Sequence, residues 1–280
     1  MTILDGKKLS NKIKEEVKME AEKLKADGIT PGLAVILVGE DPASQVYVKM
    51  KAKACKDSGI YSVVHEFPDT ITQEELIDTI ERINQNPNIH GLLIQLPLPK
   101  HIDPTIVLEK VAPEKDVDGF HPYNVGRLVA GLDSFAPCTP LGVMEMFKEY
   151  NIDVKGLDAC VVGASNIVGK PMQALLLNEF ATVDICHIYT KNLAEHTKRA
   201  DIVIVGVGKP NLITADMVKE GAIVVDIGIN RLEDGRLVGD VDFENVSKKA
   251  SFITPVPGGV GPMTIAMLLK NTIKAAKALK

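Results

Sequence analysis

The sequence predicts an α/β fold of two domains, each built on a mostly parallel sheet. Short apolar runs, such as 33–38 and 91–96, alternate with longer amphipathic segments along the chain. Because these runs are apolar on both faces, they are typical of parallel strands buried between layers of helices. A stretch rich in Pro, Gly and Asp at 113–140 interrupts the alternation, which then resumes and indicates a second domain.

The first helix is predicted from apolar residues at near-helical spacing, and it ends by Gly28. These residues are Leu9, Ile13, Val17 and Leu24. After the strand at 33–38, Asp41 and Pro42 predict the start of a second helix, because aspartate accepts hydrogen bonds from free helix amides and proline pre-sets the backbone. Gly59 ends that helix.

A third helix is predicted from the capping pair Thr72 and Glu75, and it leads to the strand at 91–96. Beyond the interruption, a helix at 140–150 precedes a second alternating series. Its strands are expected at 159–163, 182–187, 201–208 and 222–228, with helices that begin near Val168, Asn192 and Thr214.

A loop rich in Gly and Pro at 253–262 precedes the last helix, expected from about Met263. We expect this helix to pack back on the N-terminal domain. The predicted domains are therefore 1–136 together with 263–280, and a Rossmann-type parallel sheet at 137–262.

The bulk composition indicates a globular protein without nucleic-acid or membrane partners. The net charge is −5, lysines are spread along helical faces, and no apolar run approaches the roughly 20 residues of a membrane-spanning helix. The N-terminus has no apolar stretch of signal-peptide length, so we expect a cytoplasmic protein with reduced cysteines. The four cysteines form no CxxC pair and the six histidines show no metal-ligand spacing, which predicts no metal site.

The segment 161–171, VVGASNIVGKP, lies where a dinucleotide phosphate loop belongs, directly after a strand and at the start of a helix. Gly163 permits a tight turn, and the helix amides that follow can face a pyrophosphate. Ser165 replaces the second glycine of the usual GxGxxG pattern and Gly169 comes late, so a plain strand-to-helix turn stays open. The surrounding alternation of strands and helices favours the dinucleotide loop.

Asp184 lies about 20 residues after Gly163, where an acidic residue would bind a ribose 2′-hydroxyl. It is, however, in the middle of its strand, and residues 187–190 at the strand's end include no carboxylate. We therefore interpret Asp184 as a structural residue.

Tyr47, Lys51 and Cys55 are spaced four residues apart and share one face of the second helix. This helix follows the carboxyl end of a buried parallel strand, where such folds bind ligands. Burial disfavours a charged ammonium, so a lysine in such a crevice can act as a general base, with Gln95 orienting its amine. The alternatives are a solvated flank for Tyr47 and Lys51 and simple packing for Cys55, and for Cys55 we favour packing.

Asp116 and Asp118, in the segment KDVDGF, are turn residues by default. A carboxylate there could instead accept paired hydrogen bonds from a guanidine-like ring edge. The segment PVPGGVGP (255–262) is equally open, as a turn or as a place where the backbone approaches a ligand closely.

Several longer segments resemble the bifunctional methylene-tetrahydrofolate dehydrogenase/methenyl-tetrahydrofolate cyclohydrolase family. They are SQVYVKMKAKAC (44–55), QLPLP (95–99), KDVDGFHPYNVGRL (115–128), PCTPLG (137–142), GASNIVGKP (163–171), VDIGINRL (225–232) and TPVPGGVGPMT (254–264). The resemblance implies that methylene-tetrahydrofolate is oxidised with NADP and that the methenyl product is hydrolysed to 10-formyl-tetrahydrofolate. It also implies a homodimer formed largely through the Rossmann domains.

The resemblance further implies a role for each matching residue. In the catalytic set, Lys51 is the catalytic lysine, Gln95 tunes it, Tyr47 faces the folate ring and Asp118 binds the pterin. The further substrate contacts are Pro257, Gly258 and Gly259. The cofactor contacts are Gly163, Ala164, Ser165, Ile188, Thr190 and Ile229.

The cofactor preference is open because two expected anchors differ. Family members that use NADP often place a basic residue or a serine against the 2′-phosphate, whereas this chain has Ala164 and Ile188 at those places. An apolar side chain cannot pair with a phosphate dianion, so another residue, such as Lys191, would have to supply the anchor. From the habit of the family we expect NADP, with NAD as the alternative.

Three other functions were weighed against this one. A monofunctional dehydrogenase and a non-catalytic folate-binding protein are both disfavoured by the presence of Lys51, Tyr47 and Gln95. A shikimate- or amino-acid-type dehydrogenase shares the two-domain plan, but the segments KDVDGFHPYN and PVPGGVGP disfavour it.

Overall fold

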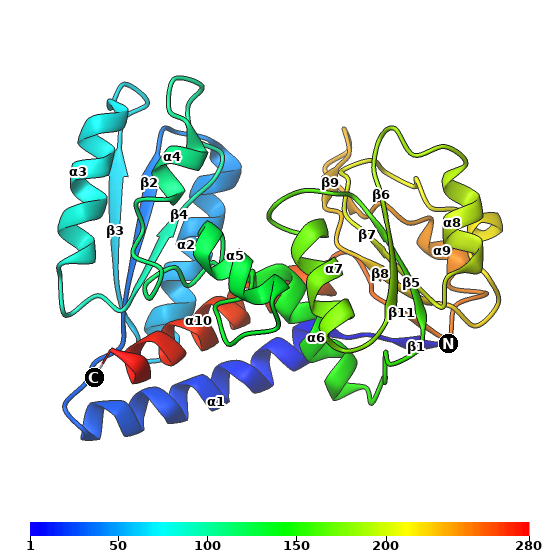
Figure 1. Ribbon diagram of the computed structural model, residues 1–280, viewed down its shortest axis with the longest axis horizontal. Coiled ribbons are helices and arrows are strands. Elements are labelled where there is room, and N and C mark those ends of the chain that lie inside the picture. The colour runs from blue at the N-terminus through cyan, green and yellow to red at the C-terminus, as the bar shows by residue number, and fades with distance from the viewer. Residues whose placement is uncertain (280) are drawn as a thin grey trace. The chain divides into compact units, whose positions relative to one another are not determined.

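The computed structural model describes residues 1–279 and divides the chain into two compact units, each with its own parallel sheet (Figure 1). Unit 1 comprises Met1–Ser10, Leu128–Leu132 and Pro137–Thr264. Unit 2 comprises Asn11–Arg127, Asp133–Ala136 and the chain from Ile265 onward. The predicted two-domain α/β architecture is confirmed.

Unit 1 includes two short segments that the predicted boundaries place in the N-terminal domain. Residues 1–10 belong with the C-terminal sheet because β1 (Thr2–Ile3) pairs in parallel with β11 (Phe252–Ile253). Residues 128–132 also pack in unit 1, where the Asn178 side-chain amide donates to the Leu128 carbonyl at 2.8 Å. Neither short segment has a hydrophobic pattern long enough to predict from the sequence which domain it packs in.

Unit 2 contains a three-stranded parallel sheet in the order β3-β2-β4. The strands are β2 (Gly32–Val38), β3 (Tyr61–Phe67) and β4 (Gly91–Ile94). The helices that lie in it wholly or mainly are α1 (Gly6–Ala26), α2 (Pro42–Asp57), α3 (Gln73–Asn84), α4 (Pro104–Leu108), α5 (Pro122–Val129) and α10 (Val260–Ala278). All seven residues of β2 are buried, as the run at 33–38 predicts for a central strand.

The predicted starts of α2 and α3 are confirmed in atomic detail. The Asp41 carboxylate accepts from the Ser44 amide at 2.8 Å and Pro42 is the first helical residue. Thr72 and Glu75 form the reciprocal capping box. The sequence analysis missed β3, because this edge strand is only half-buried and has no continuous apolar run.

The last helix packs in unit 2 over most of its length, as predicted. The Asn271 side-chain amide donates to the carbonyls of Val117 at 2.8 Å and Ala136 at 3.3 Å. Lys277 forms an ion pair with Glu20 of α1 at 2.6 Å. The helix begins at Val260, three residues before the predicted start, because Pro262 lies in the first turn, where proline is tolerated.

Unit 1 contains a six-stranded parallel sheet in the order β1-β11-β8-β7-β5-β6. Its other strands are β5 (Asp158–Val162), β6 (Thr182–Cys186), β7 (Ile202–Val205) and β8 (Ile223–Asp226), with a separate hairpin of β9 (Asn230–Arg231) and β10 (Leu237–Val238). Its helices are α6 (Cys138–Glu149), α7 (Gly169–Asn178), α8 (Leu193–Arg199) and α9 (Phe243–Val246). The helix expected near Thr214 is only the single 3₁₀ turn Ala215–Met217.

Within residues 1–279, none of the helices combines the length and the apolar character that crossing a membrane requires.

Candidate active site

Lys51 lies on the buried face of α2. This face comprises Ser44, Val48, Lys51 and Cys55, at the spacing of successive helical turns. Lys51 is only 8% exposed, which is unusual for a lysine and requires a polar partner for its amine. Its partner is Gln95, whose Oε1 accepts from Nζ at 3.0 Å.

Gln95 is held where β4 ends. Its backbone amide donates to the Ile36 carbonyl at 2.9 Å, which continues the pairing of β4 with β2 by one residue. Its side-chain Nε2 donates to the Leu96 carbonyl at 2.8 Å, so the amide oxygen is the atom turned toward Lys51. The structure therefore brings two of the predicted residues together across 44 positions of sequence.

Tyr47 and Cys55 lie one turn to either side of Lys51. Tyr47 is 37% exposed, so its ring lies at the surface of the helix. Cys55 is fully buried, and burial raises the pKa of its thiol to about 12. A thiol with so high a pKa is a poor nucleophile, which agrees with the packing role that the sequence analysis favoured.

The two aspartates of KDVDGF have different surroundings. Asp116 is buried and accepts from the amides of Phe120 and His121 at 3.1 and 2.9 Å, and from the Asn124 side chain at 2.8 Å. It is therefore the turn residue, although burial still raises the pKa of its carboxyl. Asp118 is partly exposed, two residues beyond the bridge that pairs Asp116 with Leu92 of β4.

The bridge between Leu92 and Asp116 is parallel, so both segments run toward the same end of the sheet. Two residues further along, the chain reaches Ile94 on one segment and Asp118 on the other. Gln95 follows Ile94 directly. Asp118 and Gln95 thus both lie at the carboxyl end of the sheet. Ligand-binding side chains of parallel sheets are usually found at this end.

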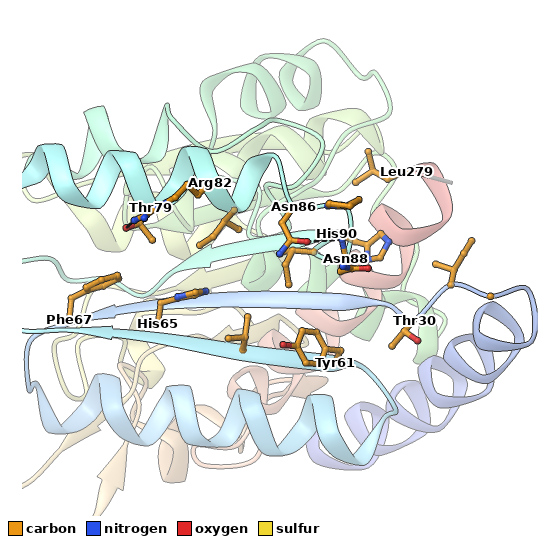
Figure 2. A pocket seen from close by; sticks show the side chains of 16 residues that line it. Thr30, Tyr61, His65, Phe67, Thr79, Arg82, Asn86, Asn88, His90 and Leu279 are labelled. Atoms are coloured by element: carbon orange, nitrogen blue, oxygen red, sulfur yellow. Dashed lines mark hydrogen bonds between the residues drawn. The ribbon is translucent and has the colours of Figure 1, made fainter.

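The large cavity of unit 2 lies elsewhere, between α3 and the edge strand β3 (Figure 2). It has a volume of about 1000 Å³. Thr79 and Arg82 of α3 face His65 and Phe67 of β3 across it. None of the predicted site residues is among those that line this cavity.

In unit 1, the predicted phosphate loop connects β5 to α7. Gly163 has a φ of +116°, and a Cβ atom built on it would lie 2.6 Å from the Gly206 carbonyl oxygen. A Cβ on Gly169 would lie 1.8 Å from the Gly163 carbonyl oxygen. The Ser165 hydroxyl accepts from the Val168 amide at 3.1 Å and so closes the turn. Both glycines are therefore required by the tight path of the loop.

The end of β6 is open to solvent. Ile188 is 91% exposed, and the adjacent Tyr189 is 87% exposed. The Thr190 hydroxyl accepts from the His187 amide at 2.9 Å, which shapes the turn. Asp184 interacts with Arg199 and, at 3.1 Å, with His196, so it is a structural ion-pairing residue as the sequence analysis interpreted it.

The loop at 255–259 packs closely against other residues of unit 1. A Cβ on Gly259 would lie 2.5 Å from the Pro255 carbonyl oxygen, and Gly6 packs directly on the Gly259 carbonyl. Gly258 has a φ of +104° and Pro257, which follows a cis peptide bond, is exposed. Gly259 is thus required by packing within the protein and Gly258 by its backbone conformation, and the loop lies directly before the start of α10.

Ile229 lies next to that start. It is 47% exposed, and its Cδ1 atom would be 3.5 Å from a Cβ built on Gly261. Ile229 and the loop at 257–259 are thereby neighbours in unit 1. Ala164, which follows Gly163 in the phosphate loop, is partly exposed.

The groups present in unit 1 fit a dinucleotide. The Gly163 turn has no room for a side chain and leads to the amino end of the 10-residue helix α7, whose dipole favours a pyrophosphate. The sequence analysis did not identify Asp226 and Asp240, two buried acids near this loop. In the sequence, each of these aspartates lies close to a glycine, in the segments DIG (226–228) and GD (239–240). Such short segments are also typical of ordinary turns, so they did not indicate buried acids.

No cluster of three or more His, Cys, Asp or Glu side chains suited to a metal ion occurs in the described part of the chain.

Comparisons with known proteins agree with this arrangement. Residues 4–118 match the catalytic domain of the tetrahydrofolate dehydrogenase/cyclohydrolase family, and residues 137–280 match its NAD(P)-binding domain. The bifunctional protein FolD of Nautilia profundicola is 80% identical over 277 residues, covering 99% of this chain and 98% of that protein.

Two solved structures are also closely similar. The bifunctional FolD methylenetetrahydrofolate dehydrogenase/cyclohydrolase from Campylobacter jejuni has a TM-score of 0.99 at 61% identity, covering 99% of both chains. The FolD enzyme of Trypanosoma brucei, solved with NADP and an inhibitor, has a TM-score of 0.95 at 38% identity, covering 99% of this chain and 98% of that one.

Proposed function

This chain belongs to the tetrahydrofolate dehydrogenase/cyclohydrolase family, and from that membership we propose that it oxidises methylene-tetrahydrofolate and then hydrolyses the methenyl product. The observation that carries this proposal is the buried amine of Lys51, held by the Gln95 side chain at 3.0 Å. Hydrolysis needs a base at that place, whereas a protein that only bound folate or transferred hydride would not need one.

The oxidation step transfers a hydride and no proton. Loss of the hydride from the methylene carbon leaves a delocalised methenyl cation, and a nicotinamide dinucleotide held by the loop at Gly163 would supply the hydride acceptor. The protein's contribution is to hold the two reactants in alignment. On the folate side we assign this task to Tyr47, whose ring packs against the pterin, and to Asp118. The Asp118 carboxylate accepts paired hydrogen bonds from the guanidine-like edge of the pterin ring.

The hydrolysis step requires a proton acceptor. Water attacks the methenyl carbon, Lys51 takes the proton of that water, and the ring opens to 10-formyl-tetrahydrofolate. Gln95 orients the amine, because its Oε1 accepts a hydrogen bond from Nζ at 3.0 Å.

On the cofactor side, Gly163, Ala164 and Ser165 would hold the pyrophosphate at the start of α7. Ile188 and Thr190 would lie near the adenosine ribose, because they follow the adjacent strand β6. Ile229 would contact the nicotinamide half, and Pro257, Gly258 and Gly259 would lie against the folate. The crowding of Gly259 and Gly6 supports a fixed shape for that last loop.

One spectrophotometric assay tests the proposed function. With methylene-tetrahydrofolate and NADP, reduced cofactor should appear first, and the absorbance of added methenyl-tetrahydrofolate should decay faster than in buffer. Reduced cofactor with no accelerated decay would instead identify a monofunctional dehydrogenase. Folate binding with neither signal would identify a non-catalytic binding protein.

We expect kcat/KM to be higher for NADP than for NAD. The FolD structure of T. brucei contains NADP, and the chain lacks a carboxylate after β6 that would select NAD. Lys191, an exposed lysine three residues after Ile188, would supply the contact to the 2′-phosphate. The comparison of kcat/KM for the two cofactors, in the protein and in Lys191→Ala, tests this. A clear preference for NAD in the unmodified protein would contradict it.

We also propose a homodimer formed through unit 1. An apolar patch supports this, and its members are Val129 (66% exposed), Leu132 (53%), Leu177 (48%) and Phe180 (73%). The bond from Asn178 to the Leu128 carbonyl joins the two segments that carry these residues. Contiguous exposed apolar side chains of this kind mark association surfaces.

Phe180→Glu should convert the dimer to a monomer, because burying a carboxylate in an apolar interface removes its hydration, which is unfavourable. Light scattering after gel filtration should show a fall from twice the chain mass of 30.3 kDa to that mass. Phe243→Glu, at a 37% exposed phenylalanine of α9, is the matched control and should remain dimeric. An unchanged mass for Phe180→Glu would rule out this surface.

A further inference from the structure

Two buried carboxylates of unit 1 lie close together, one at the end of β8 and the other just after β10. Asp226 ends β8 and is 3% exposed, while Asp240 follows β10 and is fully buried. A buried carboxylate is tolerated only when hydrogen bonds compensate for its lost hydration. The groups that compensate these two acids are almost all backbone amides of loops.

Asp240 holds the loop that follows β7. Its Oδ2 accepts from the amides of Val207 and Gly208 at 2.6 and 3.0 Å, and its Oδ1 accepts from the Lys209 amide at 2.8 Å. Three successive amides form a concavity of the kind that binds anions, and here the protein's own carboxylate fills it. The Asn230 side chain also donates to Oδ1 at 2.8 Å, directly after Ile229.

Asp226 holds the turns on either side of the β9–β10 hairpin. Its Oδ1 accepts from the amides of Gly228 and Asp240 at 2.9 and 3.0 Å, and its Oδ2 accepts from the Val241 amide at 2.9 Å. Its own amide donates to the Thr254 hydroxyl at 2.7 Å, one residue before the loop that contains Gly258 and Gly259.

The carboxylates of Asp226 and Asp240 each pack directly against a glycine, Gly239 for Asp226 and Gly228 for Asp240. A Cβ on Gly228 would lie 2.4 Å from Cγ of Asp240, and a Cβ on Gly239 would lie 1.8 Å from Oδ2 of Asp226. Each carboxylate therefore occupies the space that a side chain in the other turn would need. Burial, together with the nearby negative charge of Asp240, raises the pKa of Asp226 to about 6, which is consistent with this close approach.

The loop held by Asp240 lies where the direction in which successive strands are added to the sheet reverses. From β5, the chain first adds β6 on one side and then β7 on the other, and α/β folds bind ligands at such a reversal. Gly163 of the phosphate loop packs against Gly206 there, since an added Cβ would lie 2.6 Å from the Gly206 carbonyl. Any shift of residues 206–209 must therefore change the surface beside the phosphate loop.

We propose that Asp226 and Asp240 are positioning residues for the dinucleotide: together they hold the loops after β7, β8 and β10 in the arrangement that binds it. This proposal rests on the proposed function only in taking the ligand to be a dinucleotide. It predicts that changing the pair weakens cofactor binding and leaves hydrolysis intact, because Lys51 and Gln95 belong to unit 2.

The test is Asp240→Asn, which keeps the size of the side chain but turns an NH₂ group toward amide donors. We expect the Kd for NADP, measured by calorimetry on the full chain, to rise about tenfold or more. KM for NADP should rise by a similar factor, with kcat/KM for methenyl-tetrahydrofolate hydrolysis within about twofold of the unmodified protein. Asn230→Ala removes a single bond from a partly exposed side chain and should raise the Kd by about threefold.

Asp201→Asn is the matched control. Asp201 precedes the opposite end of β7, where it accepts from the Asp158 amide at 2.9 Å and pairs with Lys219. It should leave the Kd for NADP unchanged. The proposal is overturned if Asp240→Asn and Asn230→Ala bind NADP as tightly as the unmodified protein, or if hydrolysis falls in parallel with binding in both. Failure of the unmodified protein to bind NADP would instead refute the proposed function.

Discussion

Lys51→Met should lower the rate of methenyl-tetrahydrofolate hydrolysis by roughly 10²- to 10⁴-fold, the usual contribution of a positioned general base. The rate of hydride transfer should fall by less than about tenfold, because that step moves no proton and depends on alignment. Methionine retains the length and the apolar stem of lysine, so the packing of the 8% exposed side chain is largely preserved. What is lost is the amine that Gln95 holds.

The measurement is a pair of single-substrate assays on the same preparation, one for reduced cofactor and one for methenyl decay. Lys53→Met is the control, because Lys53 lies on the same helix but is 76% exposed and pairs only with Asp57 at the surface. A solvent-exposed pair of this kind contributes little to stability, so both activities should persist. If Lys51→Met reduced both activities equally, Lys51 would not be the base specific to hydrolysis.

Gly169→Ala should have the largest effect on the cofactor side. The added Cβ would lie 1.8 Å from the backbone carbonyl oxygen of Gly163, and no flexible side chain can move aside to admit it. The phosphate loop must therefore shift, and a displacement of about 1 Å in a binding loop costs on the order of 10²-fold in activity. Overpacking should also reduce the free energy of unfolding by about 1–3 kcal/mol.

Calorimetric titration with NADP and thermal unfolding of the same variant check both parts of this expectation. Gly126→Ala is the control, since a Cβ there meets nothing within 4 Å. Gly126 is inside helix α5, so this change should stabilise the protein by up to about 1 kcal/mol and leave cofactor affinity unaltered. Unchanged NADP affinity in Gly169→Ala would show that the loop does not bind the pyrophosphate.

The boundaries of most helices could be predicted because their signals are local. The Asp41–Pro42 start and the box of Thr72 and Glu75 each satisfy amides within one helical turn, so neighbouring residues suffice to specify them. The same holds for β2, whose burial on both faces requires an unbroken apolar run. The half-buried edge strand β3 and the two-residue strands β1 and β11 carry no comparable pattern.

The candidate site also combines features that the sequence predicts with contacts that only the structure provides. Tyr47 and Lys51 share a helix face by spacing alone, and the family resemblance supplies the rest of the set. The bond between Lys51 and Gln95 joins residues 44 positions apart, and no periodicity can express it. The distinction between Asp116 and Asp118 also required the structure, because only the three hydrogen bonds to Asp116 identify it as the turn residue.

The sequence by itself determined the α/β class and the order of the main strands and helices, since these follow from periodicity and local capping. Only the tertiary structure decided that the first strand completes the C-terminal sheet and that Asp226 and Asp240 interlock across two glycine turns. The physical reason is common to both. Such contacts join segments distant in the chain, and their stability comes from backbone pairing and steric exclusion, to which the identity of any single residue gives little clue.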